Sequence, residues 1–258
     1  MNPSFATSPD GTRIAYDLSG SGPALILLHG GWHTRQNWHE VGYVQRLQHT
    51  FTVIALDIRG NGDSDQPTDP AAYTIAKHLQ DILAVADAGG VDRFTLWGFS
   101  YGGNIGRYLA ARSARLAKFV MMGIPFGPAA AGAFRESICA YRDRWAPLLP
   151  ALQAGTLDLA TLSKEMQDEW HDLKVPVSLA WFSAMLDWGA VEPTDLRCPT
   201  LWLVGSENAV AMASIQAYAA ALPESLVQVQ VVEALDHMQE FSEIERVLPA
   251  MLTFTTSA

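Results

Sequence analysis

Short apolar runs separated by polar, helix-like stretches dominate the hydrophobic pattern of the chain. The first five runs are nearly all apolar, which is typical of parallel strands covered on both faces. The six runs are residues 24–28, 51–56, 94–97, 119–122, 200–204 and 227–232. Helix-like stretches at 74–88 and 104–112 lie between them, and an N-terminal hairpin is expected from 5–7 and 13–16. The alternation predicts an α/β fold with an open, mostly parallel, doubly wound sheet.

Residues 125–193 break this alternation, because no strand-like run occurs there. Helical segments are expected at 130–145, 157–173 and 177–188. A helical insert between two strands usually lies over the carboxyl edge of the sheet, where such sheets bind ligands. We therefore predict a core formed by 1–124 and 194–258, with a helical cap at 125–193.

Composition and charge limit the classes of partner. The 258 residues are 49% hydrophobic and carry a net charge of −10. This acidity argues against nucleic acid or an anionic membrane surface as the main partner. The chain has no apolar run of 18 residues and no signal-peptide pattern at its start. The expected protein is cytoplasmic, with Cys139 and Cys198 as reduced thiols. The oligomeric state is left open.

A glycine-flanked serine follows the run at 94–97. The stretch Gly98-Phe99-Ser100-Tyr101-Gly102 comes between a predicted strand and a predicted helix. This context indicates a tight, strained turn that exposes the Ser100 hydroxyl and aims the Tyr101 amide at a developing oxyanion.

A serine nucleophile needs a base and a second oxyanion donor. His237 is the candidate base, because it follows the last predicted strand. The early loop His29-Gly30-Gly31-Trp32 supplies the donor, with the Gly31 amide first and the Trp32 amide second. His29 is expected to brace this loop.

These motifs resemble those of the α/β-hydrolase family. The similarity rests on His29-Gly30-Gly31-Trp32, on the loop at 57–64, and on Gly98-Phe99-Ser100-Tyr101-Gly102-Gly103. The ending Leu235-Asp236-His237, followed by Glu240 and Glu243, also resembles the family. The insert matches the family's cap domain in position only, and the loop at 57–64 is expected to be structural.

The chain departs from the family pattern at the third triad residue. The resemblance implies an aspartate at position 208, which holds Asn208 instead. We expect Glu207 to supply the carboxylate. Asn208 as a neutral third member, another acid such as Asp236, or no acid at all are the alternatives.

The leading hypothesis is a serine hydrolase that cleaves an ester, lactone or related acyl bond of a small, apolar molecule without a metal or organic cofactor. Trp32, Trp145 and Trp181 are candidate pocket walls, although packing is the alternative for each. Because position 100 is not aspartate, the chain does not look like an epoxide hydrolase or a haloalkane dehalogenase. Other possibilities are carbon–carbon bond hydrolysis, a lyase or cofactor-free peroxidase, and a non-catalytic ligand-binding protein with a weakened triad.

Overall fold

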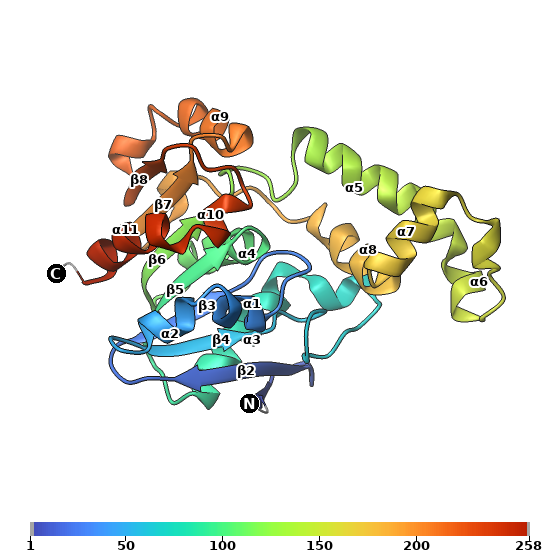
Figure 1. Ribbon diagram of the computed structural model, residues 1–258, viewed down its shortest axis with the longest axis horizontal. Coiled ribbons are helices and arrows are strands. Elements are labelled where there is room, and N and C mark those ends of the chain that lie inside the picture. Colours follow the sequence, from blue (N-terminus) through green and yellow to red (C-terminus); the bar gives the residue numbers. More distant parts are fainter. Residues whose placement is uncertain (1–2, 257–258) are drawn as a thin grey trace.

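The sheet has the expected α/β architecture. The computed structural model describes residues 3–256, and their strands form one eight-stranded sheet in the order β1-β2-β4-β3-β5-β6-β7-β8 (Figure 1). Strands β3 to β8 run parallel, and β1 and β2 form the antiparallel N-terminal hairpin. The strands are β1 (Ser4–Thr7), β2 (Arg13–Ser19), β3 (Ala24–Leu28), β4 (Thr52–Leu56), β5 (Phe94–Phe99), β6 (Leu116–Met122), β7 (Thr200–Gly205) and β8 (Val227–Val232).

Two hydrophobic cores lie on opposite faces of the sheet, since alternate side chains of each strand point to opposite sides. In β3, Ile26 and Leu28 join one core, while Leu25 and Leu27 join the other. Helices α3 (Ile75–Ala88) and α4 (Tyr101–Ala110) cover the first core, whereas α1 (Arg35–Glu40), α2 (Tyr43–Leu47) and α11 (Ile244–Thr256) cover the second. Within residues 3–256, no helix is long and apolar enough to cross a membrane.

The helices of the insert extend to one side of the sheet body (Figure 1). They are α5 (Gly132–Trp145), α6 (Leu149–Gln153), α7 (Lys164–Asp172) and α8 (Val175–Met185). Helix α8 lies nearest the body and α6 at the far end. The segments that lead into and out of these helices run side by side, because Gly127 and Val191 exchange backbone hydrogen bonds of 2.9 and 3.1 Å.

The stretch at 157–173 differs from its prediction as one continuous helix. It contains a short 3-10 turn at Leu159–Thr161, and α7 begins only after Ser163. The Asp158 carboxylate accepts from the Ala160 amide at 3.0 Å, and the Ser163 hydroxyl accepts from the Met166 amide at 3.3 Å. Each of these caps starts a new helical segment. The apolar residues keep a helical spacing across the stretch, although the helix itself is interrupted between Thr161 and Lys164.

Candidate active site

Ser100 lies in a strained turn between β5 and α4. Its φ of 49° and ψ of −113° are unusual for a non-glycine residue. The Ser100 amide donates to the Met122 carbonyl at 3.0 Å, which helps to hold the strained backbone. A Cβ at position 98 would lie 2.5 Å from the Gly102 backbone, and one at 102 would lie 2.4 Å from the Leu28 carbonyl oxygen. Only glycine therefore fits on either side of the serine.

The structure brings Ser100 and His237 together across 137 positions of sequence. The Ser100 Oγ lies 3.0 Å from His237 Nε2. His237 follows β8, and its ring stacks on Phe99 with the centroids 5.0 Å apart. The His237 side chain is 40% exposed, so water reaches the imidazole from one side. A serine hydroxyl at this distance from an imidazole nitrogen is the arrangement that a nucleophile and its base would need.

The carboxylate beside His237 belongs to Glu240, which corrects the expectation of Glu207. Glu240 lies on the short helix α10 (Gln239–Ser242), and its Oε2 is 3.2 Å from His237 Nδ1. Its side chain is completely buried. Glu207 is exposed, and within the described residues its side chain has no bond to the imidazole. The loop after β7 leaves position 207 facing solvent and buries position 208 instead.

Asn208 contacts the carboxylate rather than replacing it. Its Oδ1 accepts from the Ala211 amide at 3.2 Å and so caps α9 (Ala209–Ala217). Its Nδ2 donates to the Glu240 oxygens at 3.0 and 3.2 Å and to the Gly123 carbonyl at 3.1 Å. With Nδ2 turned toward the triad, Asn208 has no acceptor to offer the imidazole N–H. The alternative in which Asn208 itself accepts the imidazole N–H as a neutral third residue is therefore not supported by this orientation.

Glu240 is the residue that sequence reasoning missed. An acid three positions after a histidine is a usable signal, because residues i and i+3 share one face of a helical turn. The sequence places Glu240 at that spacing, within the segment that resembles the family's ending. The spacing indicates a contact only if the segment is helical. The sequence of the loop after β8 does not show this, so Glu240 was not predicted.

The two predicted oxyanion donors lie next to each other. A Cβ at position 31 would be 4.0 Å from the Tyr101 Cβ, so the Gly31 loop faces the start of α4. The Tyr101 amide, in the first turn of that helix, has no intrahelical acceptor. The Gly31 amide has no backbone acceptor among the described residues. Both N–H groups are thus available beside Ser100.

Two buried histidines contact the predicted oxyanion residues or their neighbours. His29 Nε2 accepts from the Ile58 amide at 3.0 Å, and its Nδ1–H donates to the Gly30 carbonyl at 2.7 Å. Burial lowers the pKa of His29 to about 4. His78 Nε2 and the Tyr101 hydroxyl are hydrogen-bonded at 3.0 Å, and burial lowers the pKa of His78 well below its usual value. Both rings are therefore neutral at pH 7.

This burial predicts a loss of stability in acid. Because the unfolded chain binds a proton at His29 more readily than the folded one, the free energy of unfolding falls as the pH drops from about 6.5 to about 4. The loss from His29 alone is about 3 kcal/mol, and His78 acts in the same direction. Urea unfolding between pH 7 and 4.5 measures it. His29→Asn should decline less steeply, and an unchanged decline would contradict the assignment.

Two of the three candidate pocket tryptophans lie beside Gly31. The Trp181 ring is 3.5 Å from the Cβ position of Gly31, and its centroid is 5.5 Å from that of Trp32. Trp32 is 51% exposed and has a φ of 57°. Trp145 is different: it is fully buried among the helices of the insert, where its N–H donates to Glu169 at 2.5 Å. Trp145 therefore packs the insert, whereas Trp32 and Trp181 lie beside Gly31.

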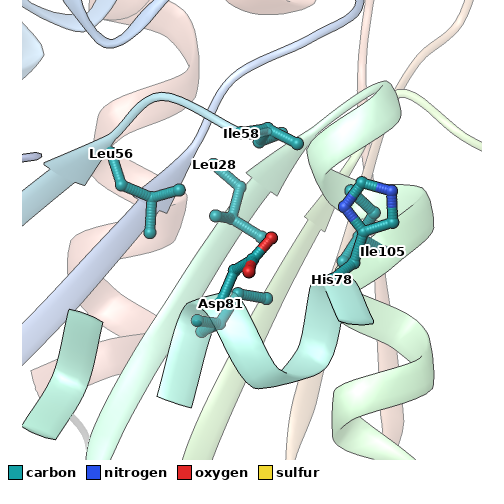
Figure 2. A pocket seen from close by; sticks show the side chains of 7 residues that line it. Leu28, Leu56, Ile58, His78, Asp81 and Ile105 are labelled. Carbon is teal, nitrogen blue, oxygen red and sulfur yellow. The ribbon is translucent and has the colours of Figure 1, made fainter. Parts of the chain in front are cut away.

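A small internal cavity lies among side chains of β3, β4, α3 and α4 (Figure 2). Its volume is about 10 Å³, which is enough for one water molecule at most. The residues that line it are Leu28, Leu56, Ile58, His78, Asp81, Ile82 and Ile105. It is too small to receive a substrate, and none of the triad residues lines it.

Comparison with known proteins agrees with this architecture. The family model described as alpha/beta hydrolase fold matches residues 23–201. The chain is 29% identical to epoxide hydrolase 1 of Siraitia grosvenorii over 205 residues, covering 72% of this chain and 63% of that protein. The chain is also 36% identical to an uncharacterized Mycobacterium tuberculosis protein over 107 residues, which make up 41% of this chain and 30% of that protein. The esterase EaEST of Exiguobacterium antarcticum has the same fold, with a TM-score of 0.75 at 22% identity over all of both chains.

The family match covers well over half of the chain, and it includes the Ser100 turn and the oxyanion loop. The protein therefore belongs to the α/β-hydrolase fold family.

Proposed function

We propose that this protein is a serine hydrolase that cleaves a carboxylic ester or lactone through an acyl-enzyme. One observation carries the proposal: Ser100 Oγ, both nitrogens of His237 and the buried Glu240 form a continuous chain of contacts at 3.0 and 3.2 Å. This chain has the geometry that a hydroxyl nucleophile, a base and an orienting acid need.

The contacts define the proton path. The His237 Nδ1–H donates to Glu240, which leaves the Nε2 lone pair free to take the Ser100 proton. As Ser100 Oγ attacks the carbonyl carbon, the Gly31 and Tyr101 amides stabilise the oxyanion. The imidazolium returns its proton to the leaving oxygen, and an acyl-enzyme remains. A water molecule then attacks the acyl carbon while His237 takes its proton. The imidazolium returns that proton to Ser100 Oγ as the acyl–Oγ bond breaks, which releases the acid and restores free Ser100.

The identity of residue 100 favours an acyl bond over an epoxide. A carboxylate that opens an epoxide forms an ester, which water can then hydrolyse at its carbonyl carbon. A serine that opens an epoxide would form an ether, which has no carbonyl carbon and would trap the enzyme. Ser100 therefore suits esters and lactones, although a relative is named epoxide hydrolase.

The surroundings of the oxyanion loop suit an apolar group. Trp32 and Trp181 pack edge to face beside Gly31, and Trp32 presents half of its surface to solvent. Burial of that indole surface by a ligand would be favourable by about 25 cal/mol per Å². We expect a small substrate with an apolar acyl or alcohol portion.

Covalent labelling tests this function. We expect an alkyl fluorophosphonate to phosphonylate the protein, with loss of fluoride, and mass spectrometry to locate the adduct on Ser100. The Ser100→Ala variant is the control and should remain unlabelled. A panel of esters, lactones and epoxides then separates the reaction types. Folded wild-type protein that does not label, and that hydrolyses only epoxides or nothing, would overturn the proposal.

A further inference from the structure

We infer that Asn208 is a positioning residue whose amide confines the single negative charge of the triad to Glu240. The kinetic part of this inference rests on the proposed function, whereas the placement of the charge does not. Positions 208 and 240 come from different elements, the loop after β7 and helix α10, yet their side chains meet next to His237.

The orientation of the Asn208 amide is determined by its neighbours. The oxygen faces the Ala211 amide at 3.2 Å, which makes it an acceptor. The nitrogen is then surrounded by acceptors, namely the Glu240 oxygens and the Gly123 carbonyl, all within 3.2 Å. A flipped amide would place an oxygen against three oxygens. Asn208 is therefore a donor to the carboxylate.

Glu240 receives a second donor from the backbone. The Gly205 amide lies 2.6 Å from Oε1. Oε2 remains to accept from His237 Nδ1 at 3.2 Å, and the side chain is fully buried. Buried carboxylates need such donors, because burial without hydrogen bonds is strongly unfavourable. Asn208 and Gly205 thus fix both the position and the rotation of the carboxylate.

An aspartate at position 208 would not be tolerated beside Glu240. One of its oxygens would take the place of Nδ2, 3.0 Å from Glu240 Oε1 and 3.1 Å from the Gly123 carbonyl oxygen. Two carboxylates at this distance cannot both be ionised. Asparagine at 208 is therefore the partner that a glutamate at 240 requires.

The same geometry allows the carboxylate to be moved from position 240 to position 208. The Asn208 nitrogen lies 3.4 Å from His237 Nδ1, only slightly farther than Glu240 Oε2. In an Asn208→Asp/Glu240→Gln double variant, the Asp oxygen would face both the imidazole N–H and the new Gln amide. The Gly205 N–H would hold the Gln oxygen at the Oε1 position, so the Gln nitrogen at the Oε2 position, 3.2 Å from the Asp oxygen, would donate to it. Because only one of the two side chains is then a carboxylate, the repulsion that excludes an aspartate at position 208 beside Glu240 is removed. One negative charge would again lie next to the imidazole.

The experiment compares Asn208→Asp, Glu240→Gln and the double variant. For phosphonylation of Ser100, we expect each single variant to be slower than wild type by tenfold or more. The double variant should be at least about tenfold faster than Glu240→Gln, since a charge-assisted hydrogen bond to the imidazole is restored. Asn61→Asp added to Glu240→Gln is the matched control, because the Asn61 amide also donates to buried carbonyls but faces no triad residue. It should give no recovery.

A second readout does not depend on catalysis. The His237 Nδ1 proton, assigned by its loss in His237→Gln, should resonate far downfield in wild type, move upfield in Glu240→Gln and return in the double variant. Aspartate is a good N-cap, so α9 should remain capped in Asn208→Asp. If Asn208→Asp does not fold, Asn208→Ser replaces it, because serine keeps a capping oxygen but lacks the amide. Asn208→Ser should also shift the His237 Nδ1 proton signal. A double variant that stays as slow and as upfield as Glu240→Gln would overturn the inference, even if wild type labels at Ser100. Unlabelled wild type whose proton signal follows the expected order would overturn only the proposed function.

Discussion

Replacement of Glu240 by glutamine is expected to slow ester turnover and the phosphonylation of Ser100 by about 10²- to 10⁴-fold. Loss of the acid's charge removes the stabilisation of the imidazolium. The Gly205 N–H would bind the Gln oxygen, so the Gln amide nitrogen would face His237 Nδ1. Two donors would then oppose each other and favour the wrong imidazole tautomer. The measurement is kcat/KM for an ester together with the labelling rate.

The matched control for this prediction is Glu207→Gln. It makes the same chemical change in the same region, but the Glu207 side chain is exposed. Its rate should stay within about twofold of wild type, as for most surface substitutions. A large loss of rate in Glu207→Gln with little loss in Glu240→Gln would indicate that Glu207 is the acid, as expected from sequence. That result would contradict a catalytic role for the Glu240 contact.

The strands and the Ser100 turn were predictable because their determinants are local. An apolar run such as 24–28 is typical of a strand that is covered on both faces, and it is observed as β3. The glycines at 98 and 102 are required by backbone contacts within the same turn and with the adjacent strand. The start of α7 at Lys164 was harder to predict, because the apolar residues keep a helical spacing through 157–173. Only the Ser163 cap marks the start of a new helix there.

The carboxylate that contacts His237 could not be predicted because its position depends on two loops that are far apart in sequence. The pattern placed Asn208 where an acid was expected, and the adjacent Glu207 was the nearest carboxylate in sequence. Burial separates the two neighbours: position 208 faces the protein interior and 207 faces solvent. Glu240 reaches the imidazole because residues 239–242 form a helical turn that begins two residues after His237.

The placement of the Glu240 carboxylate depends on more than one position. Gly123 follows β6 and has a φ of 79°, and its missing side chain leaves room for Glu240 and His237. Asn208 supplies the donors that a carboxylate at this place needs. Glycine at 123, asparagine at 208 and glutamate at 240 are thus mutually consistent, and a change at any one of them should affect the others.

Gly123→Ala is therefore expected to lower kcat/KM by about 10²-fold or more. The new Cβ would lie 2.4 Å from Glu240 Oε2 and 3.0 Å from two atoms of the His237 ring, so the acid and the base must both move. Displacement of catalytic groups by about 1 Å costs on the order of 10² in rate. Ester kinetics, together with the phosphonylation rate of Ser100, measure the effect.

Backbone strain must be separated from this steric effect, and Gly90→Ala does so. Gly90 has a similar φ of 69°, but its Cβ position has no neighbouring atom within 4 Å. Both variants should lose about 1–2 kcal/mol of stability from the left-handed backbone, and thermal melting measures that loss. Only Gly123→Ala should also lose activity at a temperature where both are folded. Equal activity in the two variants would mean that the triad tolerates the extra methyl group, and that the space at Gly123 does not control the position of Glu240.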